Sequence, residues 1–177
     1  MQLVIGHSWV RRLSDLAICG DDFVLWGQGG ATFSSFIPQV RGYFARPGRR
    51  VPEQVFVFLG SNDIDKVRGT AEVWKVVDDC KAFCKVLREC CPGARLVFSQ
   101  VEDRYAKNHL EDSRAILRDF KAKSNKFNKW LNKWEGRDDI LLIKGKGRLS
   151  VPSLYARDGV HLNYAGNERL AQLLRDF

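Results

Sequence analysis

Five short apolar runs, separated by segments of helical periodicity, constrain this 177-residue sequence more than any other feature. Each run is nearly continuous in apolar residues, a pattern typical of strands that are covered on both faces of a parallel sheet. Strands that alternate with helices predict a doubly wound α/β sandwich. The runs are QLVI (2–5), DFVLW (22–26), QVFVFL (54–59), ARLVFSQV (94–101) and DILLI (139–143).

Apolar residues spaced three or four apart predict the helices between these runs. A short stripe covers 9–16, two long stripes cover 73–91 and 113–134, and leucines at 170–174 mark a last helix. The sequence CCPGAR (90–95) ends the first long stripe with Pro and Gly in the expected place. A chain of this length can bury its own core, so we expect one domain over residues 1–177.

The cysteines predict a reducing compartment. Their number is odd, and the chain shows no secretory signal, so we expect free thiols and an intracellular, cytoplasmic protein. No apolar run approaches the roughly 20 residues of a membrane span. Because the first strand starts almost at once, we also expect the chain to be part of a longer protein. Cys80, Cys84 and Cys91 lie on an apolar helical stripe, which favours a core position over metal binding.

The net charge of +8 favours anionic partners, such as nucleic acid, anionic membrane or acidic protein. The loops 45–50 and 144–148 are basic. The segment 113–134 carries Lys121, Lys126, Lys129 and Lys133 mostly off its aromatic stripe. This pattern favours a solvated face over a packed core, and a nucleic-acid surface is the alternative.

In open parallel sheets, functional sites form just beyond the carboxyl ends of the strands. Functional side chains are therefore expected directly after each predicted strand. The segments there are GHS (6–8), GQGGAT (27–32), GSND (60–63), EDRY (102–105) and, after the fifth strand, the stretch leading to RDGVHLNYAG (157–166).

These segments hold the parts of an acyl-transfer site. A serine hydroxyl becomes a good nucleophile when a neighbouring base takes its proton, and His161 can be that base for Ser8. Asp158, three residues earlier, can hold the other imidazole nitrogen and fix the tautomer. Gly30 and Asn62 can donate hydrogen bonds to the oxyanion, and the backbone N–H of Ser8 can add a third. The alternatives are a helix cap for Ser8 and an ordinary turn for Asn62 and Asp63.

The arrangement resembles the SGNH (GDSL-type) hydrolase superfamily. The resemblance implies a flavodoxin-like three-layer fold with a five-stranded parallel sheet and Ser-His-Asp hydrolysis of esters without metal or cofactor. It places the nucleophile on Ser8, the oxyanion donors on Gly30 and Asn62, and the remaining triad members on Asp158 and His161. The blocks that carry the resemblance are GHS (6–8), GQGGAT (27–32), LGSND (59–63) and DGVHLN (158–163), in the family's order. The Gly-x-Ser-x-Gly elbow of α/β-hydrolases is absent from this sequence.

One position departs from the family's pattern. His7 stands where the family has an aspartate that organises the loop around the nucleophile, which makes His7 a candidate modulator. It can orient the same loop, crowd the site, or titrate near neutral pH beside Ser8. The Gly-His-Ser-Trp variant on a basic chain resembles the esterase-like domains of non-LTR retrotransposons and related mobile elements.

Two hypotheses about function follow. The first is a serine ester hydrolase that acts on an acetyl, short-acyl or lipid ester. The second is a hydrolase-fold module with weak or absent catalysis that binds nucleic acid or anionic membrane through its basic surface. We expect an acyl pocket near Trp9, Phe33, Tyr105 and Tyr155.

Overall fold

The computed structural model confirms the predicted parallel sheet. It describes residues 1–16, 19–105, 111–137, 139–145 and 148–177. The strands pair in parallel in the order β2-β1-β3-β4-β5, which is the flavodoxin-like order. They are β1 (Gln2–Gly6), β2 (Phe23–Gly27), β3 (Gln54–Phe58), β4 (Arg95–Ser99) and β5 (Ile140–Ile143).

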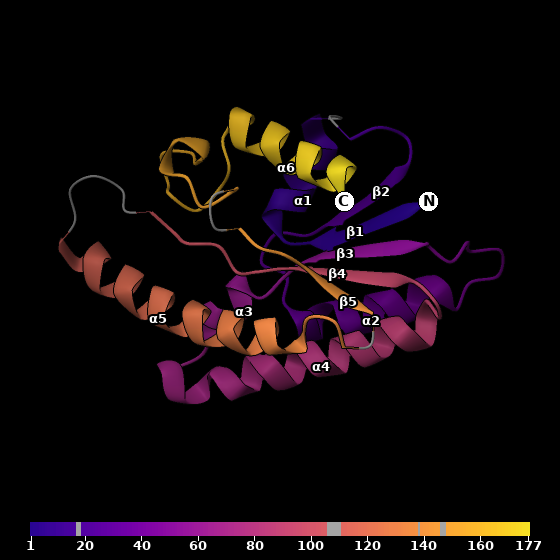
Figure 1. Ribbon diagram of the computed structural model, residues 1–177, viewed down its shortest axis with the longest axis horizontal. Helices are drawn as coiled ribbons and strands as arrows, with labels where there is room; N and C mark the ends of the chain where they lie inside the picture. The colour runs from indigo at the N-terminus through magenta and orange to yellow at the C-terminus, as the bar shows by residue number, and fades with distance from the viewer. Residues whose placement is uncertain (17–18, 106–110, 138, 146–147) are drawn as a thin grey trace.

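Helices cover both faces of this sheet and complete a three-layer sandwich (Figure 1). On one face lie α1 (Ser8–Leu16) and α6 (Tyr164–Asp176). The other face carries α2 (Phe33–Phe44), α4 (Val73–Cys90) and α5 (Glu111–Trp134). The short elements are α3 (Ser61–Lys66), η1 (Thr70–Glu72) and η2 (Pro152–Leu154). No helix among the described residues combines the length and hydropathy needed to cross a bilayer.

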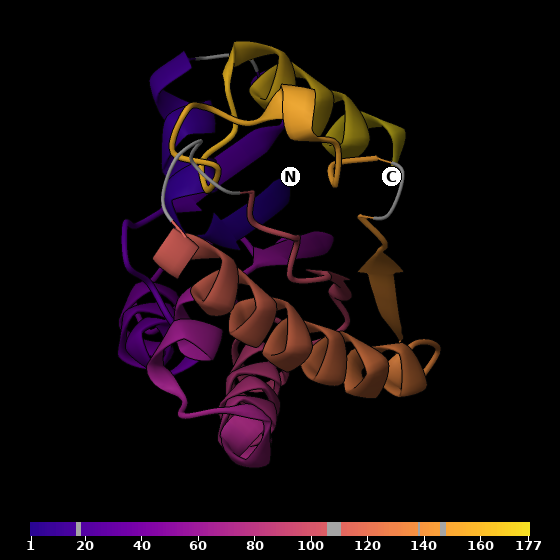
Figure 2. The same cartoon turned by 90° about the vertical axis from the view of Figure 1, so that its left-hand side faces the viewer.

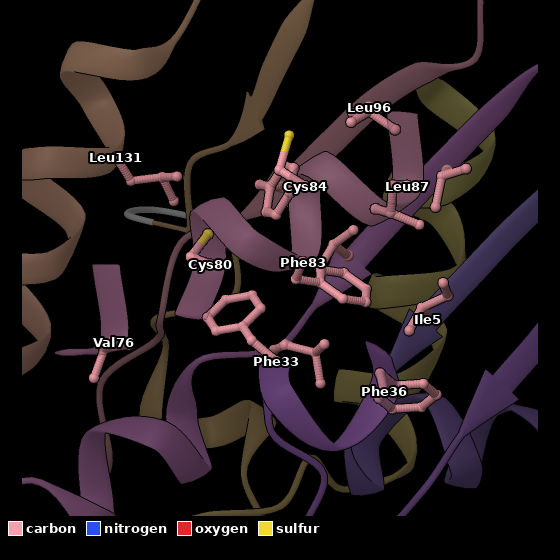
Figure 3. Packing of buried hydrophobic residues seen from close by; sticks show 14 of the residues in the cluster. Ile5, Phe33, Phe36, Val76, Cys80, Phe83, Cys84, Leu87, Leu96 and Leu131 are labelled. Carbon is pink, nitrogen blue, oxygen red and sulfur yellow. The ribbon is translucent and has the colours of Figure 1, made fainter. Parts of the chain in front are cut away.

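The apolar side chains form one core on each side of the sheet, which is why the strands are apolar on both faces. The larger core lies under α2 and α4 and centres on phenylalanines such as Phe33, Phe36 and Phe83 (Figure 3). Cys80 and Cys84 point into it, and Cys91 is buried there too. The core interpretation of these cysteines is therefore confirmed, and all five thiols are free.

The helix α2 was not predicted. Its apolar residues recur at helical spacing, but Pro38 lies inside it, and proline normally ends or kinks a helix because it lacks an N–H. A capping box formed by Thr32 and Ser35 starts the helix, and Phe33, Phe36 and Val40 are buried. Tertiary burial therefore outweighs the cost of the proline. The strand β4 is also shorter than expected, since it ends at Ser99.

The lysines of α5 lie over a packed core, as the pattern favoured. Phe120 and Phe127 are buried beneath them. Lys121 pairs with Asp103 at 3.0 Å, and Lys126 donates to the Thr70 carbonyl at 2.9 Å. Part of this positive charge is thus engaged within the protein and is not presented to a ligand.

The parallel strands all end at one edge of the sheet, which faces the viewer in Figure 2. The sequence after β1 turns directly into α1, whose backbone lies against the end of β2. A Cβ atom on Gly27 would overlap the backbone of Arg11, so only glycine permits this close approach. The glycine at the end of β2 therefore sets how near α1 lies to the carboxyl edge.

Candidate functional site

Asp158 and His161 form a close pair on the loop before α6. The Nδ1 atom of His161 lies 2.6 Å from Oδ2 of Asp158, and the second carboxylate oxygen accepts the backbone N–H groups of Val160 and His161, both at 2.9 Å. Partial burial alone would raise the pKa of Asp158, but these hydrogen bonds outweigh it and hold the pKa well below its ordinary value. A charged Asp158 fixes the proton on Nδ1 of His161 and leaves Nε2 as the basic nitrogen.

Ser8 is the first residue of α1, and its hydroxyl makes no hydrogen bond to any described residue. The cap of this helix is His7, whose Nδ1 accepts the N–H of Trp9 at 3.4 Å. The alternative that Ser8 caps the helix is therefore wrong, because the cap is His7 and Ser8 is the first helical residue. The His7 carbonyl accepts the N–H groups of Val10 and Arg11. The N–H of Ser8 belongs to the first turn, where N–H groups have no partner within the helix, so it stays available at the helix end.

A hydrogen bond ties the helix of Ser8 to the loop of His161. The indole Nε1 of Trp9 donates to the carbonyl of Val160 at 3.0 Å. The residues next to Ser8 and next to His161 are thus in contact across 151 positions of sequence. No hydrogen bond joins Ser8 to His161 themselves in the described structure. Catalytic hydrogen bonds are often long without substrate and tighten in the complex.

The two candidate oxyanion donors lie on adjacent segments. Asn62, in the first turn of α3, donates from Nδ2 to the carbonyl of Ala31 at 2.8 Å, and Ala31 follows Gly30 directly. An amide nitrogen has two N–H groups, so the second stays available. Gly30 is exposed and has a φ of 72°, which favours glycine. The structure therefore brings Gly30 and Asn62 together at the carboxyl edge.

His7 is buried and has an unusual electrostatic environment. Burial, the positive charge of Arg104 and the nearby His161 lower its pKa to about 4. The expectation that His7 titrates near neutral pH is therefore wrong, because its charged form is disfavoured at that pH. With Nδ1 accepting from Trp9, the ring proton lies on Nε2.

Asp63 has a structural role that goes beyond a simple turn. Its Oδ1 accepts the N–H of Phe33 at 3.1 Å and so joins α3 to the start of α2. Burial raises its pKa to about 6, although the hydrogen bond from Phe33 works in the opposite direction. The segment that carries Asn62 is thus anchored to the segment that follows Gly30.

The expected acyl-pocket residues divide between the two faces of the sheet. Trp9, Tyr155 and Tyr105 pack together, with ring centroids 6.0 and 4.7 Å apart. Phe33 belongs to the other core and contacts Phe83 and Phe127. Phe33 is buried because its side chain is the first apolar anchor of helix α2, and the acyl pocket near these four residues stays a prediction.

The described side chains include no group of three His, Cys, Asp or Glu residues that could hold a metal ion. Several polar and charged groups near the site pair with one another. The acidic partners are Asp158 for the His161 imidazole, Asp65 for Arg104 and Asp103 for Lys121.

The family model of the GDSL-like lipase/acylhydrolase family matches residues 5–169, which include every candidate residue above. The chain belongs to this family. Because the family is one of lipases and acylhydrolases, membership supports ester hydrolysis as the class of reaction. No curated protein matches the sequence significantly.

Solved structures with the same fold come from several bacteria. A GDSL-like lipase from Bacteroides thetaiotaomicron has a TM-score of 0.74 and 16% identity, with 99% of this chain and 85% of that chain covered. A carbohydrate acetylesterase from Sinorhizobium meliloti has a TM-score of 0.71 and 14% identity, with 99% and 96% covered. The aryl esterase of M. smegmatis has a TM-score of 0.66 and 14% identity, with 99% and 98% covered. These similarities establish the fold.

Proposed function

We propose that the protein is a serine ester hydrolase that acts on an acetyl, short-acyl or lipid ester. The observation that carries the proposal is the Asp158–His161 pair, on a loop that is hydrogen-bonded to the helix beginning at Ser8. The uncommitted hydroxyl of Ser8 and the membership in a family of lipases and acylhydrolases support it.

In this mechanism, the Ser8 Oγ attacks the ester carbonyl carbon while Nε2 of His161 takes the hydroxyl proton. The carbonyl oxygen becomes an oxyanion, which the Gly30 and Ser8 N–H groups and the Asn62 amide stabilise. The C–O bond to the alcohol then breaks, and His161 returns the proton to the leaving oxygen. Water, deprotonated by His161, attacks the acyl-enzyme and releases the acid and Ser8.

The test is labelling with a fluorophosphonate probe, with the adduct located by peptide mass spectrometry. We expect the label on Ser8 and none in Ser8→Ala. The matched control is Ser14→Ala, which changes an exposed serine of the same helix. p-Nitrophenyl acetate turnover should be lost in Ser8→Ala and kept in Ser14→Ala. Equal turnover in wild type and Ser8→Ala would refute the proposal.

As a second candidate function, we propose that the basic surface binds nucleic acid or anionic membrane, with catalysis weak or absent. A wide groove of about 630 Å³ between α6 and the segment before η2 favours this candidate, because three arginines line it and Glu168 is the acidic residue among its lining. The arginines are Arg148, Arg169 and Arg175. Guanidinium groups suit phosphate oxygens, and such binding weakens steeply with salt.

A salt titration of binding to single-stranded RNA and to anionic vesicles tests this second candidate. We expect an R148Q/R169Q variant to bind more weakly, with a smaller salt slope than wild type. R46Q, an exposed arginine of the loop 45–50, is the matched control. No measurable affinity of wild type at low salt would refute the candidate. The narrower resemblance to mobile-element esterase domains stays a prediction, as does membership in a longer chain.

A further inference from the structure

The segment EDRY after β4 has no part in the proposed mechanism, although it ends at the same edge of the sheet as the other candidate segments. Its arginine, Arg104, makes several contacts near the site. The two terminal nitrogens of Arg104 donate to the two carboxylate oxygens of Asp65 at 2.8 and 2.6 Å. One of them also donates to Oγ of Ser61 at 2.9 Å, and the guanidinium lies 4.1 Å from the ring centroid of Phe120.

These contacts hold the short helix that carries Asn62. The helix α3 has six residues, and its N-cap, Gly60, provides no side-chain hydrogen bond. A helix this short is not stable by itself and depends on tertiary contacts. Arg104 holds its first residue, Ser61, and its fifth, Asp65, so Asn62 lies between two fixed points. A planar guanidinium that makes two parallel bonds fixes orientation as well as distance.

Arg104 also faces the cap of the helix that begins at Ser8. Together with His7, Trp9 and Ser61 it lines a small, partly open cavity of about 20 Å³ at the carboxyl edge. The charged or titratable groups that face His7 are Arg104 and His161, and Glu102 and Asp103 line the same cavity. A positive charge that is fixed there disfavours a second positive charge on the His7 ring.

We propose that Arg104 is a positioning residue for the ester hydrolysis. It holds α3 so that the Asn62 amide meets the oxyanion, and its fixed positive charge adds to burial in disfavouring a second positive charge on the His7 ring, which caps the helix of Ser8. The proposal rests on the function proposed above. The positioning role differs from ordinary packing, because the shape of the Arg104 guanidinium acts on the helix of Asn62 and its charge acts on His7.

Two substitutions separate these effects. Arg104→Lys keeps the charge but loses the planar fork, whereas Arg104→Gln loses both. The matched control is Arg118→Gln, an exposed arginine on α5. We expect both Arg104 variants to lower kcat for p-nitrophenyl acetate by about 10- to 100-fold with KM little changed, because removing an oxyanion donor outright costs about 10²–10³. Thermal unfolding of each variant verifies that it is folded.

The pH dependence supplies a readout that a purely structural role would not move. The protein has three histidines, so NMR can follow the titration of the His7 ring directly. We expect the pKa of His7 to rise in Arg104→Gln and to stay near the wild-type value in Arg104→Lys. Because its His7 ring would gain a proton at a higher pH, Arg104→Gln should also begin to lose kcat at a higher pH than wild type as the solution is acidified.

The outcomes are distinct. If wild type turns over substrate in a Ser8-dependent manner and both Arg104 variants stay within twofold of Arg118→Gln, the positioning role is refuted. Wild type without Ser8-dependent turnover would refute the proposed function and the positioning role with it. If the Arg104 variants do not fold, Ser61→Ala is the alternative test, because it removes the hydrogen bond from Arg104 to the first residue of α3. An unchanged kcat in that variant overturns the proposal.

Discussion

Replacing the buried carboxyl of Glu102 by an amide should change how the stability of the protein depends on pH. Glu102 is 8% exposed, and its Oε1 has no hydrogen-bond partner among the described residues, while Oε2 accepts from Ser150. Burial raises its pKa from an ordinary 4.5 to about 7, against the lowering effect of the Ser150 hydrogen bond. The variant Glu102→Gln keeps the shape and cannot titrate.

The sign and the size follow from linkage. In the folded chain Glu102 keeps its proton up to about pH 7, whereas in the unfolded chain it loses the proton near 4.5. The folded state therefore binds more protons between these pH values, so this contribution to stability is complete below pH 4.5 and is lost as the pH rises through 7. The difference in pKa corresponds to at most about 3 kcal/mol.

Urea unfolding of wild type and Glu102→Gln, measured in parallel between about pH 4.5 and pH 8, tests this expectation. Relative to wild type, the variant should gain up to about 3 kcal/mol of unfolding free energy across that range. Asp63 is present in both chains, so its own titration cancels in the difference. Glu168→Gln, an exposed site on α6, is the control and should track wild type. A difference between wild type and Glu102→Gln that stays constant with pH would refute the reasoning.

Three further substitutions test the site and its support. Asn62→Ala should lower kcat about 10²- to 10³-fold in steady-state assays, because it removes an oxyanion donor, and a loss confined to KM would contradict that role. Trp9→Phe removes the N–H that donates to the Val160 carbonyl. It should lower the unfolding free energy by about 1 kcal/mol and should also lower kcat. An unchanged kcat would mean that this hydrogen bond does not position the loop of His161. Gly27→Ala should destabilise the fold by about 1–3 kcal/mol or more in urea unfolding, because a methyl group there overlaps the backbone of Arg11, and wild-type stability would show that α1 can move away.

The sequence predicts the sheet and its carboxyl edge well because both depend on local patterns. Each strand is a nearly continuous apolar run, and glycine or polar residues follow it near the observed boundary. The pair Asp158 and His161 lies within four residues, so its contact is also a local property. Cys80 and Cys84 were assigned to the core for the same reason, since helical spacing places them on the buried stripe.

Other features could not be predicted because they depend on contacts between distant segments. Pro38 disfavours a helix locally, and the burial of Phe33 and Phe36 outweighs that cost in α2. Arg104 contacts a helix about 40 positions away, and nothing in EDRY indicates that partner. The identity of the cap of α1 depended on a shift of one residue, from Ser8 to His7, which is below the precision of pattern-based boundaries.

The pairing of charges near the site separates its chemistry from the basic character of the chain. The net charge is +8, yet Arg104 and Lys121 are paired with Asp65 and Asp103 at the carboxyl edge. The positive charge of these two residues is thereby compensated, whereas three arginines and one glutamate line the groove along α6. None of the proposed catalytic or oxyanion residues lines that groove, and exposed charges are screened by salt. Arginine substitutions in the groove should therefore alter binding of anions and leave kcat for a neutral ester unchanged.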